Sequence, residues 1–111
     1  MSVSIVSGGV CAAKGFLCNG IRCGIKKSRM KRDIAVIVSE VPCSSAAVYT
    51  SNLVKCAPIL VTRKNLENGR AQAVIVNSGN ANTCNADGIE IAEQMCALAA
   101  AATGLKAADF V

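Results

Sequence analysis

The chain contains no histidine and no tryptophan, and aromatic residues make up only 3% of its 111 residues. Without histidine, these residues alone cannot form a Ser-His-Asp or Cys-His catalytic group, a His-ligated zinc site or a histidine pH switch. The shortage of aromatic side chains also removes the stacking platforms that most single-strand nucleic-acid binding requires. These absences favour chemistry that needs no imidazole and argue against a nucleic-acid partner.

Long apolar runs and leader signals are also missing. The longest apolar run, residues 95–102, is more than half alanine and falls short of the roughly 20 residues that cross a bilayer. Residues 1–9 have no basic start and no long apolar centre, so they do not resemble a secretory signal. We therefore expect a cytoplasmic protein that does not enter a membrane.

The seven cysteines are odd in number and include no C-x-x-C pair. This pattern disfavours both a secreted disulfide framework and a thiolate metal site, so we expect no metal. Several of the cysteines lie among alanine and valine, where cysteine behaves as a small buried hydrophobe. We expect that role for most of them.

The composition, 52% hydrophobic and 17% charged, supports one hydrophobic core. The formal net charge is +5, and six of the twelve basic residues fall within residues 22–32. Two interpretations remain open for this run: a solvated loop, or a patch that binds the phosphates of a nucleic acid or a cofactor. No phosphate-binding motif supports the second, because the pair Gly15 and Gly20 is followed by Ile21 and no G-x-G-x-x-G occurs.

The first half of the chain predicts turns and strands. Residues 1–32 are rich in glycine, which predicts turns and short extended segments without a helix. Residues 33–39 are β-branched and apolar on both faces, as in a strand covered on each side. Pro42 is expected to end this strand, and residues 46–50 to form a second strand that pairs with it as a hairpin.

The second half alternates helix and strand signals. Residues 58–62 fit either a strand or a helix, and the polar residues 63–69 fit one helical turn that ends at a glycine. Residues 71–76 predict a buried strand, and the turn residues 77–82 predict a loop at its carboxyl end.

A packed helix is predicted for residues 88–103. Asp87 and Glu90 have the spacing of a capping box, and Gly104 supplies a left-handed stop. The expected buried face comprises Ile89, Ala92, Cys96 and Ala99, widened by Ile91, Met95, Leu98 and Ala102. Residues 109–111 look like the start of another strand, so we expect residues 1–111 to be a single partial domain.

The loop Asn77-Ser-Gly-Asn-Ala-Asn82 is the most unusual segment. Three asparagines and a glycine after an apolar strand either satisfy a tight buried turn or present amide groups to a ligand. Loops at the carboxyl ends of strands are where α/β proteins place ligands. Asn80 and Asn82 are therefore candidates for lining or supporting a substrate site.

Several segments follow one another in an order typical of one family: Gly15-Phe16, Gly20, Gly24-Ile25-Lys26, residues 33–37, residues 47–52, residues 54–58 and residues 76–82 followed by Cys84. Together they resemble the glutamate N-acetyltransferase / ornithine acetyltransferase family of arginine biosynthesis. The resemblance covers nearly the whole chain and keeps the family's order. The matching residues Gly15, Gly24, Lys26, Asn52, Lys55, Asn77, Gly79, Asn80 and Asn82 look like scaffold of the family's N-terminal α chain.

The resemblance implies an acyltransferase that moves the acetyl group of N-acetylornithine to glutamate. Bifunctional members also accept acetyl-coenzyme A as a co-substrate, and no resident cofactor is expected. The family's precursor cleaves itself at a threonine, which becomes the first residue of a β chain and serves as the nucleophile. Its terminal amine can activate its own hydroxyl, so this chemistry needs no histidine.

The resemblance also implies an α/β fold of the layered α+β type, with sheets between helix layers, and a heterotetramer of α and β chains. The remainder of the α chain and the Thr-initiated β chain are the implied partners, and no catalytic residue of the family matches a position in this chain. The fragment alone is expected to be inactive. Two alternatives remain open: a small basic module that binds anions or nucleic acid, and an amide hydrolase on the same self-cleaving scaffold.

Overall fold

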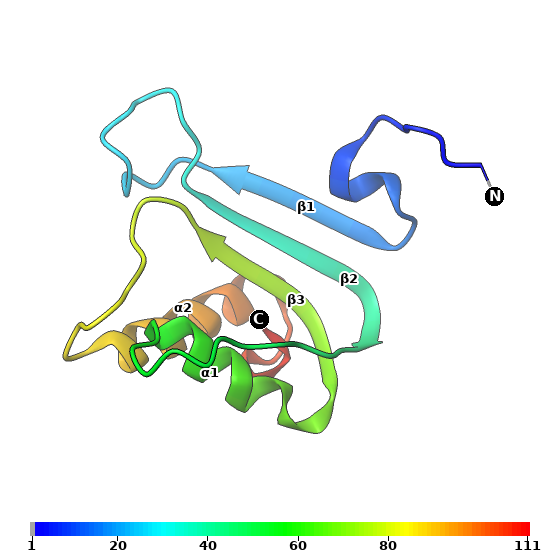
Figure 1. Cartoon of the computed structure of the whole chain (residues 1–111). Helices are drawn as coiled ribbons and strands as arrows, with labels where there is room; N and C mark the ends of the chain where they lie inside the picture. Colours follow the sequence, from blue (N-terminus) through cyan, green and yellow to red (C-terminus); the bar gives the residue numbers. More distant parts are fainter. Residues whose placement is uncertain (1) are drawn as a thin grey trace.

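Three antiparallel strands and two α-helices form the framework of the computed structural model, which describes residues 2–111 (Figure 1). Met1, the first residue of the expected N-terminal turn region, lies outside the described residues. In chain order the elements are η1 (Gly9–Ala12), β1 (Phe16–Ile21), β2 (Ile34–Ser44), α1 (Ala57–Asn65), η2 (Leu66–Asn68), β3 (Arg70–Asn77), α2 (Gly88–Thr103) and η3 (Ala107–Asp109), where η denotes a 3-10 helix. The expected mixed class of helices and sheet is confirmed.

The sheet has the order β1-β2-β3, with β2 in the centre. Val36 lies opposite Asn19 and Ile75, whereas its neighbour Ile37 lies opposite Cys18 and Val74. Because side chains alternate along a strand, Val36 and Ile75 share the face that packs against the helices. Ile37 and Val74 lie on the other face, which no α-helix of residues 2–111 covers, so the expectation of a strand covered on both sides is not met within the described chain.

The predicted hairpin between residues 33–39 and residues 46–50 is wrong. β2 continues through Pro42 to Ser44 and pairs with β1 and β3, while residues 46–50 form no strand. The register between β2 and β3 shifts between Val38 and Cys43, so Pro42 sits in a bulge where the ladder needs no N–H donor from it. The expectation that residues 1–32 contain no helix is also wrong, because η1 forms one 3-10 turn there.

The ambiguous segment 58–62 is helical, because it lies in α1 with Pro58 near its start, where a missing N–H costs no hydrogen bond. The expected turn ending at a glycine is confirmed: η2 follows α1, and Gly69 has a φ of 68°. The strand predicted at residues 71–76 is confirmed as β3.

α2 has the predicted bounds, and Gly104 ends it with a φ of 76°. The capping box is not formed, since Asp87 makes no side-chain cap hydrogen bond. The buried stripe is narrower than predicted: Ala92, Cys96, Ala99 and Ala100 are buried, whereas Ile89, Ile91, Leu98 and Ala102 are exposed. Small residues let α2 pack closely against α1 and β3, and its larger side chains project beyond these contacts.

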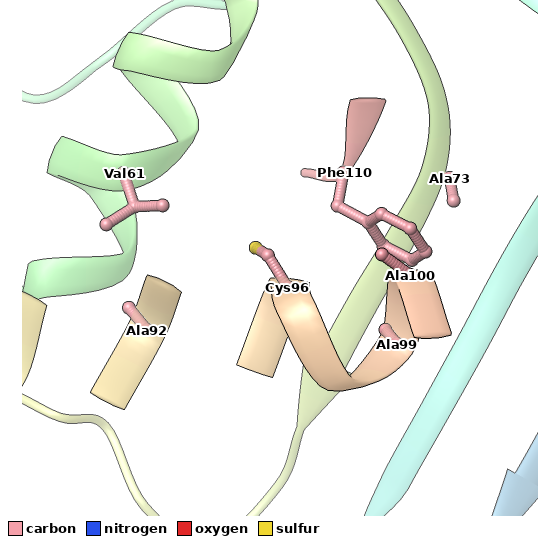
Figure 2. Packing of buried hydrophobic residues seen from close by; sticks show 7 residues of the cluster. All are labelled: Val61, Ala73, Ala92, Cys96, Ala99, Ala100 and Phe110. Carbon is pink, nitrogen blue, oxygen red and sulfur yellow. The ribbon is translucent and has the colours of Figure 1, made fainter. Parts of the chain in front are cut away.

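The core lies between α1, α2 and β3, and Phe110 is its largest member (Figure 2). Phe110 is fully buried and forms a parallel bridge with Ala73. The N–H of Val111 donates to the Ala73 carbonyl at 2.8 Å, and the N–H of Ile75 donates to the Val111 carbonyl at 2.8 Å. The predicted extended segment at residues 109–111 is confirmed from Phe110 onward, and it pairs with β3.

The expectation that most cysteines are buried is wrong. Cys96 is buried and Cys43 and Cys56 are half-buried, but Cys11, Cys18, Cys23 and Cys84 are exposed. The N-terminal region and the loops contain these four residues, and they contribute nothing to the core. Within residues 2–111 no helix is both long and apolar enough to cross a membrane.

Replacing Phe110 with alanine is expected to lower the free energy of unfolding of the intact protein by about 3–5 kcal/mol, because it leaves a cavity among α1, α2 and β3. Chemical denaturation monitored by circular dichroism measures the loss. Met30→Ala is the matched control, since Met30 is 93% exposed and its truncation should change stability by less than about 0.5 kcal/mol. Equal losses in the two variants would contradict the assignment of Phe110 to the core.

Candidate functional site

Two loops leave the sheet at the same end. Ile34, the first residue of β2, lies opposite both Ile21 at the end of β1 and Asn77 at the end of β3. The basic segment, residues 22–32 and here called the basic loop, therefore emerges beside residues 77–82, here called the asparagine loop (Figure 1). This end of the sheet gathers the two unusual segments of the sequence.

Asp33 organises the basic loop from within. Its side chain is 2% exposed, and its carboxylate accepts hydrogen bonds from the backbone N–H groups of Cys23 at 2.7 Å, Gly24 at 3.1 Å and Lys26 at 3.0 Å. These donors, first those of Cys23 and Lys26, lower the pKa of Asp33 well below the usual range of a carboxyl group. The buried charge is thus satisfied by backbone dipoles and is ionised at neutral pH.

The same carboxylate affects Cys23, since its hydrogen bond to the Cys23 thiol raises the pKa of that thiol. The loop is further closed by a hydrogen bond from Arg22 Nε to the Ser28 carbonyl at 3.2 Å. Within the described chain, Lys26 is half-buried while the other basic side chains of the loop are exposed: Arg22, Lys27, Arg29, Lys31 and Arg32. The first of the two interpretations of this run, a solvated loop, therefore fits the described residues.

The basic loop packs directly on the asparagine loop. The N–H of Ser78 donates to the Asp33 carbonyl at 2.8 Å. Gly79 has a φ of 126°, and a Cβ there would lie 3.0 Å from Ile25 Cγ2 and 3.1 Å from Lys26 Cγ. Glycine is required at this position both by the backbone conformation and by the close approach of the two loops.

Asparagine side chains hold the asparagine loop in shape. Asn77 Oδ1 accepts the N–H of Asn80 at 3.3 Å, and Asn80 Oδ1 accepts the N–H of Asn82 at 3.0 Å. Such side-chain turns substitute for backbone hydrogen bonds where the chain changes direction. The loop after β3 is therefore confirmed, and its asparagines explain how it turns.

Asn82 joins the starts of the two helices. It is 5% exposed and has a φ of 48°. Its Nδ2 donates to the Gly88 carbonyl at 2.8 Å, its Oδ1 accepts from Asn85 Nδ2 at 2.9 Å, and its carbonyl accepts the N–H of Ala57 at 3.1 Å. Asn82 is thus a buried connector between α1 and α2.

A cavity of about 320 Å³ lies between α1, α2 and the carboxyl end of β3. Its wall is largely apolar, with Asn77, Asn80 and Thr62 as polar members beside Cys56 and Met95. Asn80 lines this cavity, whereas Asn82 lies outside the lining. The two candidates from the sequence therefore have different positions. Asn80 borders the cavity, and Asn82 supports the loop from outside the lining.

The cavity wall contains no carboxylate, imidazole or amine side chain among the described residues. It can bind and orient a small ligand, and it offers no general base. Nor do residues 2–111 hold a group of three or more His, Cys, Asp or Glu side chains placed to bind a metal ion. A general base acting at this cavity must therefore come from outside the lining residues, which include the thiols of Cys56 and Cys96 and the hydroxyl of Thr62.

Sequence reasoning missed Asp33, Thr62 and Met95. Asp33 had a readable signal, because it is an isolated acidic residue between a basic run and an apolar strand. Thr62 and Met95 had none: each looks like an ordinary helix residue, and only the packing of α1 and α2 against β3 brings them to one cavity.

Comparison with known proteins gives one consistent family. The model of the ArgJ family matches residues 17–111. The arginine biosynthesis bifunctional protein ArgJ of Symbiobacterium thermophilum is 47% identical over 103 residues, which cover 91% of this chain and 26% of that protein. The protein of the same name from Gloeobacter violaceus is 47% identical over 92% of this chain and 25% of its own length. The chain thus spans about a quarter of the length of these curated relatives.

Two solved structures share this fold. The crystal structure of ArgJ from Bacillus halodurans superposes with a TM-score of 0.85 at 43% identity, covering 94% of this chain and 55% of that one. The structure of ornithine acetyltransferase complexed with ornithine from Mycobacterium tuberculosis gives a TM-score of 0.76 at 37% identity, covering 89% of this chain and 54% of that one.

Asp33→Asn is expected to destabilise the intact protein at neutral pH, because a neutral amide cannot accept three N–H bonds as a carboxylate does. The folded-state pKa is lowered, so the carboxylate contributes stability above its unfolded pKa, and this contribution is lost as the pH falls below about 4. The gap between the thermal midpoints of the two proteins, measured from pH 7 to pH 3, should therefore be constant near neutral pH and narrow below about pH 4, and it would close only at the lowered folded-state pKa. A difference that is independent of pH would contradict this role.

Asn82→Ala is expected to cost about 1–3 kcal/mol of stability, because it removes two hydrogen bonds of a buried side chain, to the Gly88 carbonyl and from Asn85 Nδ2, each worth about 0.5–1.5 kcal/mol. Asn68→Ala is the control, since Asn68 is exposed and its Oδ1 accepts only the N–H of Arg70 at 2.9 Å. Chemical denaturation measures the free energy of unfolding of both variants, and the loss should be larger for the buried Asn82 than for the exposed Asn68. A loss for Asn82→Ala no larger than the control would show that Asn82 does not join the helices.

Proposed function

The chain belongs to the ArgJ family, and from this premise we propose that the intact protein transfers the acetyl group of N-acetylornithine to glutamate. The match of the family model to residues 17–111 carries the proposal. It is supported by relatives named as bifunctional proteins of arginine biosynthesis and by a solved neighbour described as an ornithine acetyltransferase complexed with ornithine.

The proposed reaction passes through an acetylated threonine. The intact precursor cleaves itself, and the new N-terminal threonine of the β chain attacks the acetyl carbonyl while its amine accepts the hydroxyl proton. An acetyl ester forms, the amide bond breaks, and ornithine leaves with that proton. The amine of glutamate then attacks the ester, which yields N-acetylglutamate and frees the threonine. Acetyl-coenzyme A is proposed as a second acetyl donor, consistent with the bifunctional relatives.

The nucleophile and the oxyanion hole are proposed to lie outside these 111 residues. The cavity has polar groups for orientation but no general base among its lining residues, so it suits a supporting wall. Chemistry carried by a terminal threonine also needs no histidine, and the chain has none.

Within this chain, Asn80 is proposed to contact substrate and Asn82 to position it. Asn80 lines the cavity, and its Oδ1 accepts the N–H of Asn82 at 3.0 Å, so this hydrogen bond holds the orientation of its side chain. An amide side chain also has N–H donors suited to an acyl or carboxylate oxygen. Asn82 acts indirectly, because its own polar groups are engaged with Gly88 and Asn85.

The proposed assembly is a heterotetramer of α and β chains in the cytoplasm. No α-helix of residues 2–111 covers the apolar sheet face around Ile37 and Val74, and this open face supports the proposal that another part of the assembly packs on it. No nucleic-acid or membrane partner is proposed, since the basic loop is explained by its wrapping around Asp33.

The activity is tested with the intact protein and N-acetylornithine carrying a deuterated acetyl group, with glutamate as acceptor. Mass spectrometry is expected to detect deuterated N-acetylglutamate and free ornithine in equal amounts. Labelled acetate without N-acetylglutamate would instead identify an amide hydrolase, and no consumption of N-acetylornithine would refute acetyl transfer. N-terminal sequencing of the active preparation should find a second chain that begins with threonine.

The role of Asn80 is tested in the same assay. Asn80→Ala is expected to lower kcat/KM by roughly tenfold, the effect of losing one hydrogen bond of about 1–1.5 kcal/mol. Asn68→Ala is a matched control, because Asn68, like Asn80, accepts the N–H of the residue two positions on. Equal kcat/KM losses in the two variants would assign Asn80 to the turn alone.

A further inference from the structure

Two exposed cysteines meet outside the candidate site. Cys11 lies in η1, Cys18 lies in β1, and their sulfur atoms are 3.1 Å apart. Both are free thiols and both are exposed. Among the described residues, no other pair of cysteine sulfurs is in hydrogen-bond contact.

The backbone brings the two thiols together. Gly15, with a φ of 83°, turns the chain so that η1 folds back against β1. The turn is anchored to the sheet, because the N–H of Glu40 donates to the Gly15 carbonyl at 2.9 Å. Cys18 lies opposite Ile37, on the sheet face that no α-helix of residues 2–111 covers, and η1 lies against this face at β1. The approach of the sulfurs therefore follows from the fold of this corner.

The separation suits covalent closure. A disulfide bond is about 2.0 Å long, so the sulfurs need to move together by roughly 1 Å. The exposure of both thiols gives a small oxidant direct access to either one. The remaining exposed cysteines, Cys23 and Cys84, have no second cysteine sulfur in contact within residues 2–111.

We propose that Cys11 and Cys18 form a reversible disulfide when the protein meets a small-molecule disulfide, and that this bond fastens η1 to β1. One cysteine thiolate attacks the small disulfide, whose S–S bond breaks and releases one small thiolate. The second cysteine thiolate attacks the resulting mixed disulfide and releases the other. The two protein thiols are oxidised, the small disulfide is reduced to two thiols, and the protons of the cysteines pass to solvent or to the released thiolates. This site goes beyond the proposed acetyl transfer and does not depend on it.

The test uses the intact protein, reduced and then treated with graded oxidised glutathione, quenched in acid and alkylated. Trypsin separates the two cysteines, because it cleaves after Lys14 and after Arg22. Oxidation is expected to yield the peptide of residues 1–14 linked to the peptide of residues 15–22, at about tenfold or more above any other linked pair, because these two sulfurs already lie 3.1 Å apart and thus have a high effective concentration toward each other. Dithiothreitol should restore both alkylation sites.

Matched variants complete the test. Cys11→Ser and Cys18→Ser are each expected to abolish the linked pair and to leave a glutathione adduct on the remaining cysteine. Cys84→Ser removes an exposed cysteine elsewhere and should leave the linked pair unchanged. Glutathione adducts spread evenly over the exposed cysteines of the unaltered protein, without the linked pair, would overturn the proposal.

Discussion

The end of the sheet that carries the candidate site depends on one buried carboxylate. Asp33 sits where β2 begins, and its side chain gathers backbone N–H groups from a loop that would otherwise hold six like charges together. Because its donors are backbone groups, no second long side chain has to lose rotamer freedom to satisfy this charge, as it would in an ion pair. Five of the six basic side chains of this loop are exposed, whereas Lys26 is half-buried beside Gly79.

Asp33 also limits the position of the asparagine loop, because that loop contacts the backbone of Asp33 and the basic loop that Asp33 holds. The carbonyl of Asp33 accepts the N–H of Ser78, and the loop it holds presses Ile25 and Lys26 against Gly79. Gly88 makes an equally close approach further on, since a Cβ there would lie 3.0 Å from Ala57 Cβ. Close backbone approach, enforced by glycine and alanine, thus links the sheet, the loop and both helix starts in one chain of contacts.

The sequence predicted the elements whose signals are local. β3, α2 and the loop between them follow from a β-branched run, turn residues and a left-handed stop within a few positions of one another. The false hairpin shows the limit, because Pro42 ends a strand only if its missing N–H is needed, and that depends on a register shift against β3. Likewise, the partners of Asp33 are backbone groups 7 to 10 positions away, which no side-chain pattern reveals.

The candidate site shows why residue type alone does not assign a role. Asn80 and Asn82 stand two positions apart in one motif, and both take part in the same turn. The two residues differ in burial. Asn82 is buried and its polar groups form hydrogen bonds that join α1 to α2, whereas Asn80 lies at the cavity wall. A buried, fully bonded amide makes its neighbour rigid, and a rigid neighbour can orient a ligand without loss of side-chain entropy on binding. In the asparagine loop, Asn82 therefore supports the fold while Asn80 borders the cavity. Loss of the Asn82 side chain should lower the stability of the protein, because Asn82 is the buried residue of the two.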